Sequence, residues 1–151
     1  NSVSGNNITA NNYYGIWLDY SSNNSVSGNN IANNYYGIRL DHSSNLNRFY
    51  HNNFVNNTQQ VYSYASINVW DDGYPSGGNY WSDYTDVDQY SGPNQDQPGS
   101  DGIWDHPYVI DPYAKDNYPI VPEFPSILII PLFMIATLLP VVLLKNRKCP
   151  P

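Results

Sequence analysis

The chain has 151 residues, a formal net charge of −7 at pH 7, one cysteine and 15 tyrosines, and this length suggests one domain with an appendage. The last seven positions hold three of the six Lys and Arg residues, so the remainder is acidic, which argues against a nucleic-acid-binding protein. A single cysteine excludes an internal disulfide framework and a metal site built from several cysteines.

The first 64 residues repeat themselves with a period of about 22. Residues 1–23 read NSVSGNNITANNYYGIWLDYSSN, residues 24–45 read NSVSGNNIANNYYGIRLDHSSN, and a weaker copy spans 47–64. Apolar residues recur at three phases: Val3, Val26 and Phe49; Ile8, Ile31 and Phe54; Ile16, Ile38 and Val61. A fixed period with fixed apolar phases predicts a solenoid. Because the chain starts inside a repeat and lacks an initiator Met, we expect it to be the C-terminal part of a longer protein.

The composition of each copy decides which solenoid this is. Leucine appears only at Leu18 and Leu40 in the two clear copies, which is too few for a leucine-rich repeat, and the many Asn, Ser and Gly residues disfavour helices. Short alternating apolar runs fit strands, and the NN and SSN clusters fit turns. Neighbouring coils would then pair as parallel strands roughly 4.8 Å apart. In that arrangement the apolar rows become interior ladders, and Asn7, Asn30 and Asn53 become an amide ladder in a turn.

The repeats and the segment after them resemble a known family. The copies with the pattern NNxxGIxLxxSxxN are similar to the repeats of NosD-like proteins, also called CASH-type domains. NVWDDGYPSGGNYWSDYTDVDQYSGP (68–93) and GSDGIWDHPYVID (99–111) resemble the closing region of archaeal surface members of that family, although Trp104-Asp105-His106 departs from its pattern. The resemblance covers about residues 1–120 and implies an all-β fold, a right-handed parallel β-helix.

We divide the chain into five parts on this basis. Parallel β-helix coils are expected over 1–65 and an irregular C-terminal cap over 66–120, because a solenoid needs cover for its last open edge. A Pro-rich linker (121–126), a transmembrane helix (127–144) and a basic tail (145–151) would follow.

The C-terminal part of the sequence predicts attachment to a membrane. Residues 127–144 are uncharged, and at ~1.5 Å per residue they would span roughly 27 Å, close to the ~30 Å hydrocarbon core of a bilayer. Lys145, Arg147 and Lys148 follow at once, which places this end in the cytoplasm and the β-helix outside. The Pro122-Glu123-Phe124 motif before the helix resembles PEF-CTERM archaeal sorting signals, which implies an archaeosortase-type processing enzyme. Whether the helix is removed stays open.

Strand alternation places one group of side chains outside the predicted solenoid. There are two outward rows: Trp17, Arg39 and Tyr62 in one, and Asp19, Asp41 and Tyr64 in the other. A cation–π contact between Trp17 and Arg39 is expected. Aromatic rings stack on the C–H faces of sugars, and carboxylates bind their hydroxyls, so these rows are the candidate glycan-binding strip. The alternative is a solvated sheet face with favourable cross-strand pairs.

A catalytic role for the two aspartates of this strip is a less favoured hypothesis than glycan binding or a solvated sheet face. Adjacent coils would place the Cα atoms of Asp19 and Asp41 about 5 Å apart, which is compatible with the carboxyl pair of a retaining glycosidase. Both occupy the same repeat phase, however, and Arg39 would keep Asp41 ionised. We therefore expect no catalytic residue here. A polysaccharide lyase, hydrolase or epimerase with its site in upstream coils is the alternative function.

The sequence offers two candidates for metal binding, one for calcium and one for copper. Asp83, Asp86 and Asp88 in the predicted cap are a candidate calcium site, because Ca²⁺ prefers oxygen ligands, although an EF-hand frame starting at Asp86 fails at its glycine and glutamate positions. NosD itself is linked to copper-site maturation of nitrous oxide reductase, and copper requires His, Met or Cys ligands. These residue types do not share a repeat phase here: they are His42, His51, His106, Met134 and Cys149. We expect no copper site and no cofactor apart from calcium.

Together these observations predict a membrane-directed, extracytoplasmic β-helix protein with a structural or adhesive role at the cell envelope. The expected partners are the membrane, an envelope glycan and an archaeosortase-type enzyme, with no nucleic acid. A NosD-like accessory factor in copper-site maturation is a further alternative. Asn7, Asn23 and Asn56 begin Asn-x-Ser/Thr sequons, so glycosylation stays open.

Overall fold

The computed structural model describes residues 1–122 of the chain. Over this part the chain forms fourteen short strands and no helix, and so none that is long and apolar enough to cross a membrane. Several predictions lie outside the described residues: Glu123 and Phe124 of the sorting motif, the helix over 127–144 and the basic tail over 145–151.

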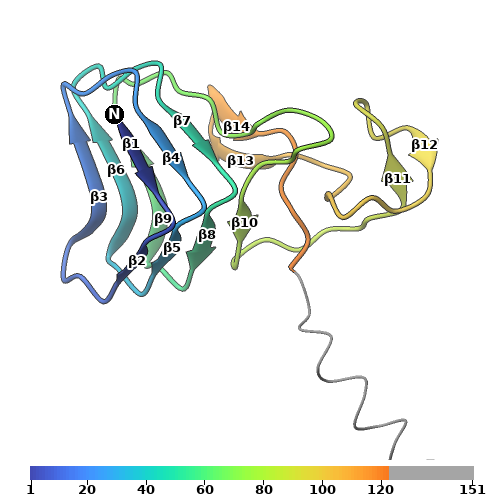
Figure 1. Ribbon diagram of the computed structural model, residues 1–151, viewed down its shortest axis with the longest axis horizontal. Coiled ribbons are helices and arrows are strands. Elements are labelled where there is room, and N and C mark those ends of the chain that lie inside the picture. The colour runs from blue at the N-terminus through green and yellow to red at the C-terminus, as the bar shows by residue number, and fades with distance from the viewer. Residues whose placement is uncertain (123–151) are drawn as a thin grey trace, which may run out of the picture. The chain divides into compact units, whose positions relative to one another are not determined.

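Residues up to Ser63 wind through three coils of three strands each (Figure 1). The strands are β1 (Ser2–Ser4), β2 (Asn7–Thr9) and β3 (Tyr14–Asp19); β4 (Ser25–Ser27), β5 (Asn30–Ala32) and β6 (Tyr36–Asp41); and β7 (Arg48–Tyr50), β8 (Asn53–Val55) and β9 (Gln59–Ser63). Equivalent strands of neighbouring coils pair in parallel, in the orders β1-β4-β7, β2-β5-β8 and β3-β6-β9. The predicted all-β solenoid of parallel strands is confirmed.

The three apolar rows expected from the repeat form the ladders inside the coils. The pairs in register are Val3 with Val26 and Phe49, Ile8 with Ile31 and Phe54, and Ile16 with Ile38 and Val61. In the second and third coils these side chains are buried. Two of the ladders end on tryptophans, since Phe49 stacks on Trp70 and Phe54 on Trp81, each with ring centroids 4.3 Å apart.

Asparagines, most of them buried, form a second kind of ladder at the corners between strands. The side-chain Nδ2 of Asn6 donates to Oδ1 of Asn29, Asn29 donates to Asn52, and Asn52 donates to Asn79, each over 3.0 Å. Each Oδ1 also accepts the backbone N–H of the same donor residue, so the amide satisfies backbone groups that the corner leaves without a strand partner. Two further corners repeat the pattern: Asn11, Asn34 and Asn57, and Asn24, Asn47 and Asn68.

The predicted amide ladder of Asn7, Asn30 and Asn53 was wrong by one position. These residues begin β2, β5 and β8 and are exposed, and Asn30 donates to Asn7 over 2.7 Å. The buried ladder uses the first residue of each Asn-Asn pair, because that residue sits at the corner, where its side chain points into the coil.

Residues 66–122, which we call the closing segment, contain β10 (Tyr80–Trp81), β11 (Tyr90–Ser91), β12 (Gln97–Pro98), β13 (Tyr108–Asp111) and β14 (Ala114–Asp116). Strand β10 pairs in parallel with β8 and extends that sheet by one strand. The other four strands form two antiparallel pairs, β11 with β12 and β13 with β14.

The central asparagine ladder ends on a buried aspartate of the closing segment. Asp116, in β14, is fully buried, and its Oδ2 accepts the backbone N–H of Asn79 at 2.7 Å and the indole N–H of Trp81 at 2.9 Å. Its Oδ1 accepts the backbone N–H of Tyr118 at 3.1 Å. A carboxylate only accepts hydrogen bonds, so Asp116 terminates a chain of amides that all donate in the same direction.

Candidate functional site

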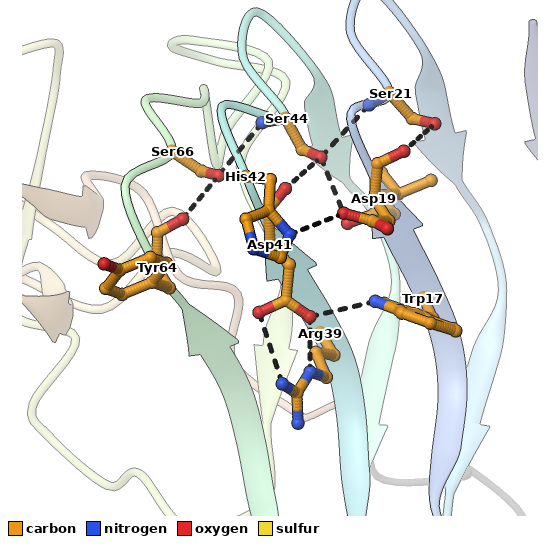
Figure 2. Close-up of polar contacts among 10 residues, drawn as sticks. Trp17, Asp19, Ser21, Arg39, Asp41, His42, Ser44, Tyr64 and Ser66 are labelled. Carbon is orange, nitrogen blue, oxygen red and sulfur yellow. Dashed lines mark hydrogen bonds and ion pairs between the residues drawn. The ribbon is translucent and has the colours of Figure 1, made fainter.

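The outer side of the β3-β6-β9 sheet carries the predicted strip. Trp17, Arg39 and Tyr62 lie on one rung across the three strands, and the Trp17 side chain is 54% exposed. Asp19 pairs in register with Asp41 on the next rung. Figure 2 shows the side chains of Trp17, Asp19, Arg39 and Asp41 projecting from two neighbouring strands on the same side of the sheet. We call Tyr14, Trp17, Tyr36, Arg39 and Tyr62 the aromatic face.

Arg39 is the centre of the aromatic face. Its guanidinium carbon lies 5.3 Å from the ring centroid of Tyr14, 5.7 Å from that of Tyr36 and 4.9 Å from that of Tyr62. The expected contact of Arg39 with Trp17 is wrong, because the indole N–H of Trp17 instead donates to Asp41 Oδ2 over 2.9 Å. The Trp17 ring packs on Tyr14, with centroids 5.5 Å apart. The face is thus one contiguous array of rings around a single cation.

Tyr14 and Tyr36 are functional candidates that the sequence analysis missed. Strict alternation places them on the same side as Ile16 and Ile38, inside the coil, yet their rings lie outside against Arg39. The alternation breaks at the following glycines, which face inward: a Cβ on Gly15 would lie 2.5 Å from the carbonyl oxygen of Gly37. The repeated Tyr-Tyr-Gly triplet is the signal in the sequence that marks this break.

The Asp41 carboxylate is held within the face. It is buried, with 4% of the residue exposed, and it accepts hydrogen bonds from both Arg39 and Trp17. The Arg39 guanidinium, together with the indole N–H of Trp17, outweighs the effect of burial and lowers the pKa of Asp41 below its usual value. An ionised carboxylate whose oxygens are already occupied orients the ring of Trp17 and the guanidinium of Arg39. It does not serve as a general acid.

The second row of the predicted strip is arranged differently. Asp19 Oδ1 lies 2.8 Å from Nδ1 of His42, and the His42 ring stacks on Tyr20 with centroids 4.9 Å apart. Tyr64 follows β9, and its ring lies edge-on to His42 at 6.4 Å. The two aspartates therefore have separate partners, Asp19 with His42 and Asp41 with Arg39, and they do not act as a pair.

The three aspartates proposed for calcium point to different partners. Asp83 accepts the Tyr108 hydroxyl at 3.3 Å, and Asp88 accepts the backbone N–H groups of Asp101 and Gly102, each at 3.0 Å. Asp86 accepts the backbone N–H of His106. Burial raises its pKa, but the hydrogen bonds outweigh this, led by that of the His106 ring, and the net shift is downward. Within residues 1–122 no three His, Cys, Asp or Glu side chains converge on a metal-sized site.

Comparisons with known proteins give one match. A family model described as "Periplasmic copper-binding protein (NosD)" matches residues 1–86. No curated protein and no solved structure matches the chain.

The donor set in residues 1–122 does not fit copper. Its three histidines contact different groups: His42 contacts Asp19, His51 contacts the Ser76 carbonyl and His106 contacts Asp86. This part of the chain contains no cysteine or methionine, so histidine is the only one of the usual copper-ligating side chains in it. Met134 and Cys149 lie outside the described residues.

Proposed function

This chain belongs to the family of periplasmic copper-binding proteins named NosD, and we propose that it is an extracytoplasmic β-helix protein that binds a glycan at the cell envelope through its aromatic face. The description of the family as periplasmic supports a location outside the cytoplasm.

The observation that carries the proposal is the array of rings around Arg39. Aromatic side chains present broad apolar faces, and the apolar C–H faces of pyranose rings stack on such surfaces. Trp17 is fixed by its hydrogen bond to Asp41 and remains 54% exposed, so little conformational freedom is lost when a sugar stacks on it. The guanidinium of Arg39 supplies hydrogen-bond donors for hydroxyl or carboxylate groups of the same sugar.

The repeat geometry favours a polymer over a single sugar. Neighbouring coils place equivalent side chains roughly 4.8 Å apart, and Trp17, Arg39 and Tyr62 follow this spacing on one rung. A polysaccharide that runs along the solenoid axis meets one of these side chains per coil. We infer a binding direction across the strands and a structural or adhesive role.

The remaining parts of the chain fit the same role. We propose that residues 66–120 cap the solenoid and that residues 127–144 hold the protein in an archaeal membrane, with the C-terminus in the cytoplasm, before any processing. We also propose that Pro122, Glu123 and Phe124 direct an archaeosortase-type enzyme to this segment. Mass spectrometry of the mature C-terminus tests this. A chain that ends before residue 127 supports processing, and a full-length chain contradicts it.

A glycan array probed with the full chain in a mild detergent tests the proposed function. Trp17→Ala removes the exposed indole, and we expect it to abolish binding of the recognised glycan while changing the melting temperature little. Tyr90→Ala removes another half-exposed ring, in β11 away from the face, and serves as the matched control. No binding by the folded wild type, or equal binding by Trp17→Ala, would refute the proposal.

A further inference from the structure

Strand β9 is the last strand of its sheet, whereas the other two strands of the third coil, β7 and β8, each pair with a further segment of the chain. Strand β8 is followed by β10, and Arg48 of β7 bridges to Val69, but the β3-β6-β9 sheet ends at β9. Within residues 1–122, β9 therefore has one free edge that faces the closing segment. A free strand edge offers unpaired N–H and C=O groups to another strand.

The backbone groups on the free edge can be identified. The N–H of Tyr64 donates to the carbonyl of Leu40 over 2.9 Å, so between Gln60 and Tyr64 every second residue directs its backbone groups toward β6. The N–H and C=O groups of Val61 and Ser63 consequently point away from β6. The side-chain amide of Gln59 donates to the carbonyl of Val61 over 2.9 Å, so this carbonyl already has a partner within the chain. The N–H of Val61 and both backbone groups of Ser63 are the ones left for another strand.

Two cavities, which we together call the groove, lie beside this edge and are lined by residues of β9 and β13 and the loops that follow them. A cavity of about 220 Å³ is bordered by Gln59 and Val61 on one side and by Tyr108 and Ile110 on the other. A larger cavity of about 660 Å³ follows beside Ser63. Strand β13 belongs to a two-stranded sheet with β14, so the groove lies between one edge strand of each sheet.

The lining of the groove indicates what it binds. Three apolar or aromatic residues of the larger cavity are mostly exposed, namely Tyr64 at 58%, Ile67 at 75% and Tyr113 at 95%. Asp83 lines the smaller cavity and Asp111 the larger one, and neither lining contains Lys or Arg. The negative charge of the two aspartates and the open backbone edge together suit an extended peptide with apolar residues and at least one Lys or Arg.

We propose that this groove binds an extended peptide segment of a partner protein, which adds to β9 as a strand. The N–H of Val61 and the N–H and C=O of Ser63 pair with the peptide backbone, an apolar side chain enters the larger cavity, and a basic side chain meets Asp83 or Asp111. A peptide is favoured over a glycan because the groove offers a row of backbone donors and acceptors at strand spacing. The site shares no residue with the aromatic face.

The test begins with a phage-displayed library of random decapeptides panned against the full chain in detergent. We expect recovered peptides to combine alternating apolar residues with Lys or Arg. The best peptide is then measured by fluorescence polarisation, beside a copy N-methylated at alternate residues. The unmethylated peptide should bind and the methylated copy should not, since methylation removes the N–H donors that strand addition needs.

A matched pair of variants at one residue locates the site. Ser63→Pro removes the backbone N–H on the free edge and leaves the Tyr64 bond to β6 intact, because proline is tolerated in edge strands. Ser63→Ala keeps that N–H. We expect roughly fivefold weaker peptide binding for the proline variant, the effect of one hydrogen bond, and unchanged binding for the alanine variant.

Several results would overturn the proposal. They are failure of the library to enrich any peptide, equal binding of the N-methylated copy, equal binding by Ser63→Pro, and displacement of the peptide by an oligosaccharide, which would make the groove a carbohydrate site. Near-ultraviolet circular dichroism establishes that Ser63→Pro is folded. If it is not, the N-methylated peptide still decides the question with the wild-type chain.

Discussion

Replacing Asp116 by alanine should destabilise the protein more than any surface change. The carboxylate is fully buried and receives the N–H of Asn79 at 2.7 Å, the indole N–H of Trp81 at 2.9 Å and the N–H of Tyr118 at 3.1 Å. It also ends the amide ladder that runs from Asn6 through all three coils. Alanine leaves these donors without an acceptor in a place that water cannot easily reach.

The expected magnitude follows from counting those donors. A buried donor that loses its partner costs about 1–3 kcal/mol, and partial relaxation around the smaller side chain recovers some of this. We therefore expect Asp116→Ala to lower the free energy of unfolding by about 3–5 kcal/mol, a large part of the ~5–15 kcal/mol typical of a folded domain. Asp116→Asn keeps one acceptor oxygen but turns an N–H₂ group toward a donor, so we expect about half that loss.

Urea unfolding of the full chain, followed by tryptophan fluorescence, measures these differences. Asp96, an exposed aspartate of the closing segment, provides the control through Asp96→Asn, which should change the free energy of unfolding by less than ~0.5 kcal/mol. A loss below about 1 kcal/mol for Asp116→Ala would mean that the ladder does not depend on its terminal carboxylate.

Three further outcomes follow from the same contacts. Burial raises the pKa of Asp116 to about 7, above its value in the unfolded chain, so the folded protein binds a proton more readily than the unfolded chain. The free energy of unfolding should therefore fall as pH rises from about 4 through 7. Urea midpoints measured across this range check it, and the slope should disappear in Asp116→Asn. Gly78→Ala should strongly destabilise the protein, since the added Cβ would lie 1.9 Å from Asp116 Oδ1. A melting temperature equal to that of the wild type would contradict this close packing of Gly78 against Asp116. Arg39→Gln should lower the melting temperature at pH 7 by leaving Asp41 without its cation, with a smaller effect below the pKa of that carboxyl.

The register of the coils could be predicted from the sequence because equivalent residues recur at a nearly constant spacing along the repeat. Ile16, Ile38 and Val61 recur at nearly equal spacing, and stacking equivalent residues is the arrangement that buries all three in one ladder. The outward rung of Trp17, Arg39 and Tyr62 follows from the same register. Periodicity is therefore sufficient wherever adjacent coils carry the same pattern.

The details that escaped prediction depend on single departures from that pattern. Both residues of an Asn-Asn pair look equivalent in the sequence, and only the position of the corner makes Asn6 rather than Asn7 the ladder residue. Tyr14 reaches the outer face because Gly15 permits a close approach of two backbones, which alternation alone does not anticipate. Asp116 contacts Asn79 across 37 positions without any repeat, so no spacing rule indicates this bond.

A crystal structure of the chain with the oligosaccharide selected on the array tests the central claim most directly. The account predicts sugar rings stacked on Trp17 and Tyr62, with a hydroxyl or carboxylate of the ligand bound by Arg39. A ligand bound elsewhere on the solenoid, with the rings around Arg39 left in contact with solvent, would contradict it.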